Sequence, residues 1–290
     1  MRYGLTMFAT DTTWRIDDLA VAAEERGFAS LYIPEHTHIP VSRRTPPPTG
    51  DAVLPEGYKR TLDPFVALAA AGARTERIRL GTGIALLAQR EPIVTAKAVA
   101  TLDLLTGGRI DLGIGFGWNV DEMENHGVDP AHRRARVRET VLALRTLWTD
   151  DVAEFSGTHV RIAPSWSWPK PVQPGGPPVL LGSAPGPKAL AAVAEYCDGW
   201  MPIGGAGIRE ALPTLEAACA GVGRDPASVT IVPFGTLYEP GKVDYYASIG
   251  ISEVVLRIPA GPRDEVLPEL DRLADAIGTG SDPGPGPHRG

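Results

Sequence analysis

The sequence predicts a single α/β domain that folds as a (β/α)8 TIM barrel. Short runs rich in β-branched and aromatic residues alternate with longer runs rich in alanine and leucine, about eight times along the chain. Several of the strand-like runs are continuously apolar, which is typical of parallel strands buried on both faces. The length of 290 residues also suits one barrel, which needs roughly 250 residues.

The first half of the chain predicts four strand–helix units. Strands are expected at residues 3–8, 30–34, 78–83 and 110–114. Helices are expected at residues 14–26, from Pro64 onward, at 92–105 and at 131–148. Gly27 suits the end of the first helix, and Asp63 is expected to cap the second, with Pro64 at its first position.

The second half predicts four more strands after an irregular stretch. Pro, Gly and Trp accumulate between residues 150 and 178, where residues 153–160 are expected to form a small hairpin. The later strands are expected at residues 179–181, 199–202, 229–233 and 253–258, with helices between and after them. The barrel domain therefore spans residues 1–277. The tail 278–290 is expected to be disordered, because it has no apolar periodicity.

Insertions are expected after strands 2 and 4 and before strand 5, at residues 35–62, 115–130 and 150–178. The first two follow strands, so they should lie on the C-terminal face of the barrel, where barrel enzymes keep their active sites. Long loops in compact domains are usually functional or mobile. The functional site is therefore expected on this face.

The composition excludes several classes of function. The chain carries 28 Lys and Arg against 35 Asp and Glu, a net charge of −7, which argues against nucleic-acid binding. Its two cysteines, Cys197 and Cys219, form no CxxC pair, so a reducing compartment is expected. The N-terminus lacks a signal-peptide pattern, and no apolar run approaches the ~20 residues of a membrane helix. We expect a cytoplasmic enzyme for small molecules, without a membrane partner, and a homodimer as the oligomeric state.

Glu35 and His36 directly follow the second expected strand. A carboxylate beside an imidazole can serve as an acid–base pair, because histidine titrates near neutral pH. A polar loop of solvated histidines is the alternative interpretation. A metal site would use His36 and His38, but the other histidines follow no expected strand, so we expect no metal. Those histidines are His126, His132, His159 and His288.

Two glycine-rich segments follow the third and fourth expected strands. Gly81-Thr82-Gly83-Ile84 ends the third strand, where glycine permits the close approach of a flat ligand or forms a simple turn. Residues 113–118 read Gly-Ile-Gly-Phe-Gly-Trp. Their spacing does not fit a GxGxxG dinucleotide fingerprint, so a Rossmann fold is disfavoured and a cofactor-facing bend remains.

Two further features suit an anion. Gly182-Ser183-Ala184 precedes an expected helix, and its N–H groups, its hydroxyl and the nearby Lys188 can bind a phosphate. Ordinary N-capping by Ser183 is the alternative. Four arginines start the helix at 131–148, either as a solvated face or beside an anionic cofactor tail. They are Arg133, Arg134, Arg136 and Arg138.

Taken in order, these segments resemble the luciferase-like monooxygenase superfamily, especially its branch dependent on the deazaflavin coenzyme F420. The resemblance covers residues 3–277. It is most specific over residues 80–118, LGTGIALLAQREPIVTAKAVATLDLLTGGRIDLGIGFGW. Residues 122–127 and the arginine-bearing helix also resemble this family.

The resemblance implies roles for these residues. His36 would transfer the proton beside the reactive ring, with Glu35 orienting it or tuning its pKa. Gly83-Ile84 would carry a non-prolyl cis peptide behind the ring, next to Thr82. The ring would be lined by Gly115, Phe116, Gly117 and Trp118, and the phosphate would be bound by Gly182, Ser183 and Ala184. Some flavin-using relatives place a phosphate-binding arginine at the position of Phe116, so its absence favours F420 over FMN.

The expected function is hydride transfer between coenzyme F420 and an unidentified small organic substrate. One alternative is an FMNH2-dependent two-component monooxygenase of the same fold. A second alternative is a non-catalytic flavin- or ligand-binding barrel.

Overall fold

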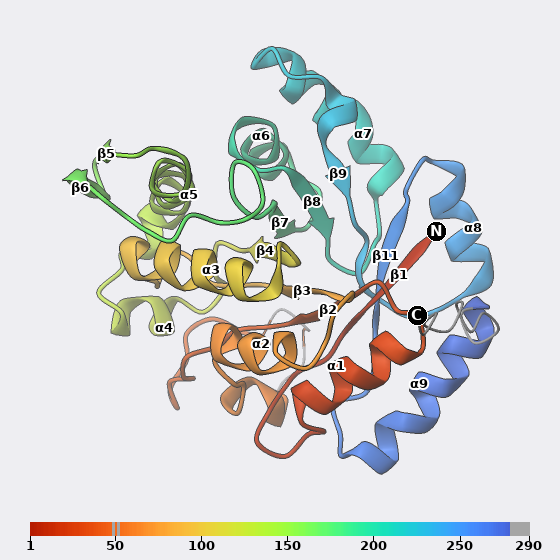
Figure 1. The fold of residues 1–290 in the computed structure, drawn as a ribbon. Coiled ribbons are helices and arrows are strands. Elements are labelled where there is room, and N and C mark those ends of the chain that lie inside the picture. The colour runs from red at the N-terminus through yellow and green to blue at the C-terminus, as the bar shows by residue number, and fades with distance from the viewer. Residues whose placement is uncertain (48–49, 51–52, 279–290) are drawn as a thin grey trace, which may run out of the picture.

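A curled sheet of parallel strands forms the centre of the molecule in the computed structural model, which describes residues 1–47, 50 and 53–278 (Figure 1). The order of its described strands is β10-β11-β1-β2-β3-β4-β7-β8-β9. Their bounds are β1 (Arg2–Thr6), β2 (Ser30–Ile33), β3 (Arg79–Thr82), β4 (Ile110–Ile114), β7 (Val179–Ser183), β8 (Gly199–Pro202), β9 (Thr230–Ile231), β10 (Phe234–Thr236) and β11 (Glu253–Arg257).

The two edges of this sheet meet. β9 and β10 stand at opposite ends of the strand order, yet only Val232 and Pro233 separate them along the chain. Ile203, after β8, forms a parallel bridge with Phe234, and the N–H of Gly204 donates to the carbonyl of Phe234 at 2.8 Å. One strand was expected at 229–233, whereas the structure has β9 at Thr230–Ile231 and a second short strand, β10, at Phe234–Thr236. Pro233, which lies between them, has no N–H to donate to a neighbouring strand. The expected α/β fold is confirmed as a parallel sheet that curls on itself.

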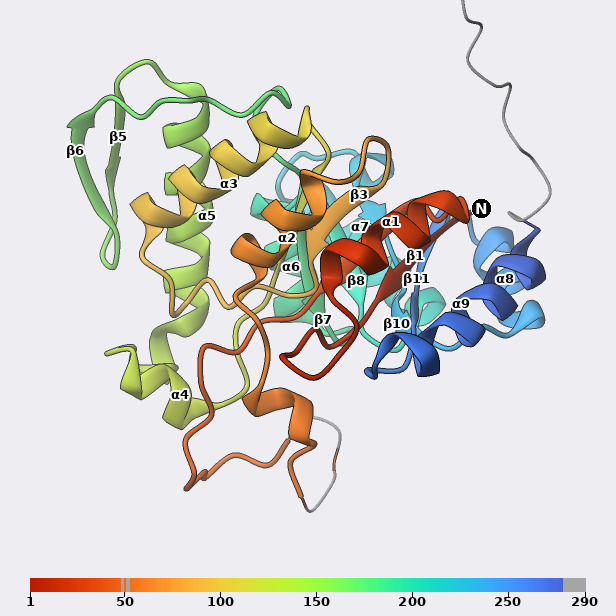
Figure 2. The ribbon, with the colours of Figure 1, turned by 60° about the horizontal axis from the view of Figure 1, so that its bottom comes forward.

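Helices cover the outside of the sheet (Figures 1 and 2). They are α1 (Ile16–Glu25), α2 (Pro64–Gly72), α3 (Pro92–Thr106), α4 (Val120–Asn125), α5 (Arg133–Thr149), α6 (Pro187–Tyr196), α7 (Ile208–Gly221), α8 (Pro240–Ser248) and α9 (Arg263–Ile277). The expected cap of α2 is confirmed: Asp63 accepts from the N–H groups of Phe65 and Val66 at 3.0 and 3.1 Å, and Pro64 follows it. No helix of the described part of the chain is long and apolar enough to cross a membrane.

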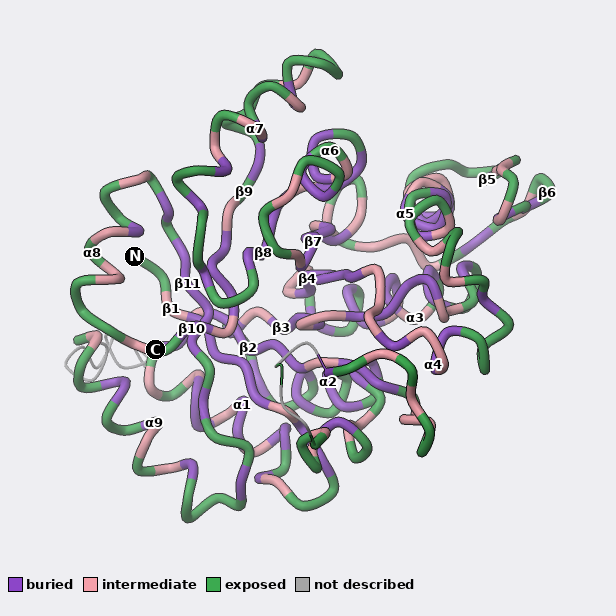
Figure 3. Tube along the Cα trace, turned by 180° about the vertical axis from the view of Figure 1, so that it is seen from behind, coloured by how far each residue is buried: buried purple, intermediate pink, exposed green. Residues whose placement is uncertain are grey.

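Most residues of the central strands are buried, and the strands are largely purple in Figure 3. One cluster fills the space between the strands and the surrounding helices. A smaller cluster comes from strands on different sides of the curled sheet, and it consists of Tyr32, Leu180, Met201, Val232, Phe234 and Val255. Burial on both faces explains why these strands read as continuous apolar runs.

The segments between the regular units contain their own short elements. The segment between β2 and α2 contains the 3-10 helix η1 (Glu56–Lys59), and the segment after β4 contains α4. Figure 2 shows α4 on the same side of the molecule as the orange segment that precedes α2. The expected hairpin is confirmed as the antiparallel pair β5 (Ala153–Ser156) and β6 (Arg161–Ser165). Of the expected disordered tail, Gly278 ends α9 and residues 279–290 lie outside the described residues.

Candidate active site

The expected site residues follow β2, β3, β4 and β7, which are neighbours in the sheet and run parallel. Because the strands are parallel, their carboxyl ends share one edge of the sheet. Glu35 and His36 follow β2, Gly83 and Ile84 follow β3, and Gly115 follows β4. The structure thus brings these segments together at one edge.

Ile84 lies at the centre of this edge. The peptide bond between Gly83 and Ile84 is cis, as the family resemblance predicted. A Cβ built on Gly115 would lie 2.0 Å from Ile84 Cδ1, and one on Gly182 would lie 2.5 Å from Ile84 Cγ2. Both positions therefore admit glycine only, as long as Ile84 keeps this place. Ile84 itself is only half-buried, so part of an apolar surface remains open.

Hydrogen bonds reach both the backbone and the two ring nitrogens of His36, and only 8% of its surface is exposed. The hydroxyl of Thr61 accepts from the His36 backbone N–H at 3.1 Å and donates to its carbonyl at 2.7 Å. Its ring atom Nδ1 lies 2.8 Å from Oε2 of Glu122 on α4. The indole Nε1 of Trp118 donates to the other ring nitrogen, Nε2, at 3.3 Å.

These two ring contacts determine the tautomer of His36. An indole N–H can only donate, so Nε2 must carry a lone pair. Nδ1 therefore carries the hydrogen and donates it to the Glu122 carboxylate. His36 thus carries a hydrogen on Nδ1, and its potential proton acceptor, Nε2, faces Trp118 of the expected cofactor segment.

Glu122 was not among the residues that the sequence singled out for the site. Its side chain is fully buried, and its second oxygen, Oε1, accepts from Nε2 of Gln89 at 3.1 Å. Gln89 Oε1 is buried and has no hydrogen-bond partner among the described residues. A buried chain of three side chains, Gln89–Glu122–His36, therefore supports the imidazole.

Glu35 does not orient His36, contrary to expectation. One of its oxygens accepts from the backbone N–H of Leu86 at 2.8 Å, and the other accepts from Nε of Arg90 at 2.7 Å. Neighbouring residues of an extended segment point to opposite sides, so Glu35 turns away from the side that His36 faces. Burial alone lowers the pKa of the Arg90 guanidinium, but its bonds to Glu35 and Asp63 outweigh burial and raise that pKa. Glu35 thus fixes the segment after β3 to the end of β2.

Aromatic rings pack around His36. The ring centroids of Tyr58 and Trp118 lie 5.3 and 5.7 Å from that of His36, and 5.9 Å from each other. Phe8, after β1, lies 4.9 Å from Tyr58. Tyr58 belongs to η1, so the segment between β2 and α2 contributes one wall of the site. No motif in the sequence marked Tyr58 or Thr61.

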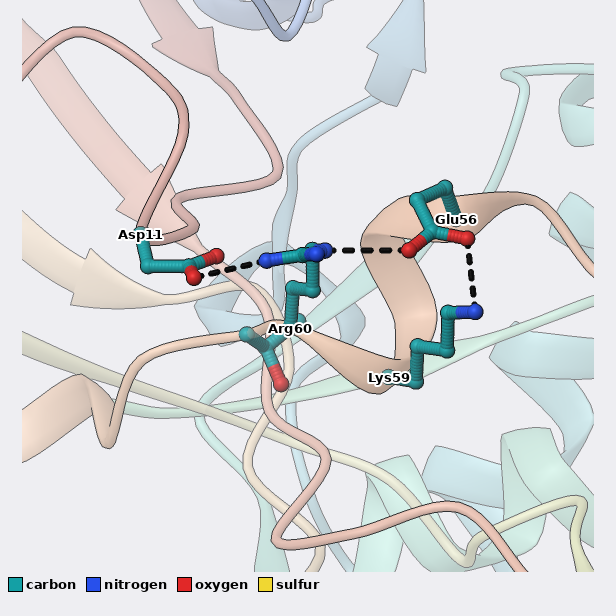
Figure 4. A pocket seen from close by; sticks show the side chains of 5 residues that line it. Asp11, Glu56, Lys59 and Arg60 are labelled. Carbon is teal, nitrogen blue, oxygen red and sulfur yellow. Dashed lines mark hydrogen bonds and ion pairs between the residues drawn. The ribbon is translucent and has the colours of Figure 1, made fainter. Parts of the chain in front are cut away.

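Beyond Thr61 lies an open polar pocket of about 420 Å³ (Figure 4). Arg60 bridges Asp11 at 2.7 Å and Glu56 at 3.0 Å, and Lys59 pairs with Glu56 at 2.7 Å. Figure 4 shows these four side chains joined in one network at the side of the pocket. Two carboxylates balance two cations here, so the pocket does not select for either sign of charge.

The start of α6 carries the residues expected to bind phosphate. Ser183 does not cap this helix: its N-cap is Gly186, which provides no side chain, and the Ser183 hydroxyl accepts from the indole of Trp200 at 3.2 Å. Ala184 and Lys188 are exposed. The N-terminus of α6 therefore has no side-chain cap, and a positive side chain lies in its first turn.

Arg134 lies over Phe116, with its guanidinium carbon 4.1 Å from the ring centroid. None of the ion pairs found among the described residues involves Arg134. Burial and the neighbouring charge of Arg133 lower its pKa. The other arginines of this run are engaged: Arg138 pairs with Glu195, and Arg136 donates to the carbonyl of Ala88. Arg134 thus places an unpaired cation beside the segment 115–118.

Other reactive groups do not form a site. No group of three or more His, Cys, Asp or Glu within the described residues could hold a metal ion. His38 contacts Asn125 and Thr37, and the ring of His126 lies 5.4 Å away. Burial raises the pKa of the Cys197 and Cys219 thiols, which are free and buried.

Comparison with known proteins identifies the family and several relatives of this chain. Residues 7–238 match the family of luciferase-like monooxygenases. An uncharacterized protein of Mycobacterium tuberculosis is 44% identical over 277 residues, which cover 94% of this chain and 98% of that protein. The F420-dependent glucose-6-phosphate dehydrogenase of Nakamurella multipartita is 31% identical over 274 residues, which cover 90% of this chain and 74% of that enzyme.

Solved structures share the fold. The monooxygenase RslO1 from Streptomyces bottropensis superimposes with a TM-score of 0.75 at 23% identity, covering 95% of this chain and 98% of its own. An F420-dependent secondary alcohol dehydrogenase, in complex with an F420-acetone adduct, also gives a TM-score of 0.75, at 18% identity, covering 97% of this chain and 100% of its own.

Proposed function

Because the chain belongs to the luciferase-like monooxygenase family, we propose that it is an oxidoreductase that exchanges a hydride between coenzyme F420 and a small organic substrate. The relative from Nakamurella multipartita, whose name states F420 dependence, supports this choice of coenzyme. The observation that carries the proposal is the edge of the sheet where Ile84 and His36 meet the segment 115–118. We assign the reaction to the cytoplasm, since both cysteines are unpaired.

The residues at this edge fit a flat, phosphate-bearing cofactor. Gly115 and Gly182 let Ile84 pack directly onto the ends of two strands, and the exposed part of Ile84 offers an apolar support for a ring. The ring would be held by Thr82, Gly83, Ile84, Gly115, Phe116, Gly117 and Trp118. The phosphate would be held by Gly182, Ser183 and Ala184, at a helix start without a side-chain cap.

The protein would provide orientation and proton transfer. When bound, the deazaflavin supplies a hydride acceptor or donor. His36 accepts or returns the accompanying proton at Nε2, because Nδ1 is occupied by Glu122. Trp118 must leave Nε2 before that atom can reach a substrate, since its indole N–H now occupies the lone pair.

Parallel binding titrations with oxidised F420 and with FMN test the cofactor assignment. We expect tighter binding of F420, and redox turnover of F420 with at least one alcohol or carbonyl substrate of a screened panel. A micromolar Kd for FMN that is lower than the Kd for F420 would contradict the proposal. Tight F420 binding without turnover of any substrate would instead indicate a binding protein.

The second candidate function is that of an FMNH2-dependent two-component monooxygenase, and Arg134 favours it. The sequence argument against FMN rested on Phe116 replacing a phosphate-binding arginine. In the structure, Arg134 places a guanidinium 4.1 Å from the Phe116 ring, so a cation is present beside this position after all. Oxygen consumption in the presence of an FMN reductase separates the candidates, because deazaflavins do not readily activate oxygen.

The contribution of Arg134 can be measured with ligands that differ only in the phosphate. We expect Arg134→Gln to weaken FMN binding by about 10- to 150-fold and to leave riboflavin binding unchanged, since a charge-assisted hydrogen bond contributes about 1.5–3 kcal/mol. Arg138→Gln is the matched control, because its guanidinium is already paired with Glu195. Equal losses for both ligands would show that Arg134 acts by packing on Phe116.

A further inference from the structure

We propose that Glu122, held in place by Gln89, is a positioning residue that fixes His36 in its Nδ1–H tautomer and so reserves Nε2 for proton transfer. This inference rests on the proposed function only in assigning the proton transfer to His36. The tautomer itself follows from contacts within the protein, so it can be measured without substrate or cofactor.

The carboxylate of Glu122 is placed for this purpose. Both of its oxygens are used, Oε2 by His36 Nδ1 at 2.8 Å and Oε1 by Gln89 Nε2 at 3.1 Å. It is fully buried, and no lysine or arginine among the described residues pairs with it. A buried carboxylate without a lysine or arginine partner is costly. Its charge is best compensated when the imidazole that faces it becomes positive, as it does after Nε2 takes a proton.

The other contacts of His36 agree with this tautomer. Thr61 binds the His36 backbone through both its N–H and its carbonyl. Trp118 can only donate to Nε2. If the hydrogen were on Nε2, it would face the indole N–H, and Nδ1 would present a lone pair to the carboxylate. Both contacts would then be repulsive, so this arrangement supports one tautomer only.

The proton balance of the step is simple. A bound deazaflavin would supply the hydride acceptor for a substrate that is oxidised. The O–H or N–H bond of that substrate would break, and its proton would form a new bond to Nε2 of His36. Nδ1 keeps its own hydrogen, which it donates to Glu122, throughout. The imidazolium returns the Nε2 proton to solvent, or to the substrate in the reverse reaction.

Substitution of Glu122→Gln tests the inference, with Glu124→Gln as the matched control. Glu124 lies on the same short helix but is half exposed and pairs with Arg44. The tautomer is read by nitrogen-15 NMR of histidine-labelled protein, with the His36 signals assigned from His36→Asn. We expect wild type and Glu124→Gln to show a pyridine-type Nε2. We expect Glu122→Gln to raise the share of the other tautomer, since an amide can accept from or donate to Nδ1 and only the Trp118 contact then favours a lone pair on Nε2.

Kinetics give the second measurement. We expect Glu122→Gln to lower kcat about 100-fold with KM and cofactor affinity nearly unchanged, as an acid–base group contributes about 10²–10⁴-fold. Gln89→Met keeps the carboxylate and removes its second support, so an intermediate loss is expected. This variant also serves if Glu122→Gln fails to fold.

The outcomes separate the inference from the proposed function. A wild-type His36 with hydrogen on Nε2, or Glu122 and Gln89 variants with unchanged tautomer and kcat, would overturn the role of Glu122. If His36→Asn retains full turnover, the proposed role of His36 fails even when the tautomer is as stated. A protein that turns over neither F420 nor FMN would contradict the proposed function and leave the NMR result standing.

Discussion

At the scale of single residues, the contact between Ile84 and two glycines determines the shape of the cofactor edge. A Cβ on Gly115 would approach Ile84 Cδ1 to 2.0 Å. Valine lacks that one methyl group. The pair Gly115 and Ile84 therefore permits a test in which a collision is introduced and then removed.

We expect Gly115→Ala to destabilise the protein by about 1–3 kcal/mol, as overpacking does, and to weaken cofactor binding. Adding Ile84→Val should recover most of the lost stability and most of the lost cofactor affinity. The double variant should therefore be destabilised by less than the sum of the two single substitutions. Urea unfolding and cofactor titration measure the two effects. Gly241→Ala is the control, because nothing lies within 4 Å of a Cβ at that position. Strict additivity would show that Ile84 is not the group displaced.

Glu35 illustrates how a residue beside a catalytic candidate can be structural. We expect Glu35→Gln to lower the free energy of unfolding by about 3 kcal/mol, because one partner of a buried ion pair is removed and Arg90 keeps only Asp63. The His36 tautomer should not change, since Glu35 does not touch the ring. Unfolding in urea and the NMR spectrum check the two statements. A changed tautomer with unchanged stability would reverse the roles of Glu35 and Glu122.

At the scale of elements, the β5–β6 hairpin is fixed to α5 by one carboxylate. Glu139 accepts from the backbone N–H groups of Thr158, His159 and Val160 at 3.0, 2.6 and 2.9 Å. A Cβ on Gly157 would lie 2.3 Å from this carboxylate. Burial raises the pKa of the Glu139 carboxyl, but these three bonds outweigh burial and hold that pKa below its ordinary value of 4.5.

The lowered pKa of Glu139 predicts how its contribution depends on pH. A carboxyl whose pKa is lower in the folded state stabilises that state above its unfolded pKa, and this stabilisation is lost as the pH falls through the folded pKa. We expect Glu139→Gln to cost about 1–3 kcal/mol at pH 7 and progressively less below pH ~4.5. The urea midpoints of wild type and Glu139→Gln, compared from pH 7 to pH 3, measure this difference in stability. The exposed Glu154→Gln should show no effect. A cost that does not depend on pH would contradict this account.

The elements also explain what the sequence could predict of the site. Strand ends were predictable from apolar runs, so the segments that carry His36, Ile84, Gly115 and Gly182 were found. Glu122 was not, because α4 has only six residues, too few for a helical period, and lies 86 positions from His36. Adjacency in sequence favoured Glu35, although neighbouring side chains of an extended segment point apart. Contacts between distant segments depend on how the strands are arranged, which no local pattern contains.

At the scale of the whole molecule, the site depends on the order of the strands in the sheet. Its residues come from the ends of β2, β3, β4 and β7 and from two long segments between strands and helices. Asp121 of α4 accepts from the backbone N–H of Arg44 at 2.9 Å and pairs with its guanidinium at 3.0 Å, and Arg44 belongs to the segment after β2. Any movement of α4 therefore withdraws Glu122 from His36. The alternation of strands and helices predicted the fold, whereas these ion pairs between segments became visible only in the structure.

The outer face of α2 and α3 leads us to propose that the protein is a homodimer. α2 contains no charged residue. Five of the side chains on these two helices are large, apolar and exposed by 46% or more, namely Val66, Ile93, Val94, Leu104 and Leu105. Val94 and Leu105 lie eleven positions apart, on one side of α3. The nearby Trp168, whose carbonyl accepts from Lys97 of α3, is exposed by 58%. An apolar face of this kind suits a second copy, since a two-fold interface places the same patch on both partners.

Light scattering during gel filtration tests the dimer. We expect the wild type to have twice the mass of its 30.8 kDa chain, and the double substitution Val94→Glu with Leu105→Glu to give a monomer. A stable interface buries about 1,000 Å² or more, so two buried charges per chain in its centre should dissociate it.

Val222→Glu is the matched control, because Val222 is exposed by 52% at the end of α7, away from this face. A wild-type monomer at micromolar concentration, or a dimer that survives the double substitution, would show that α2 and α3 are not the interface. We also expect the monomeric variant to keep its cofactor binding, because all residues of the candidate site belong to one chain. Such a result would show that each copy holds a complete site.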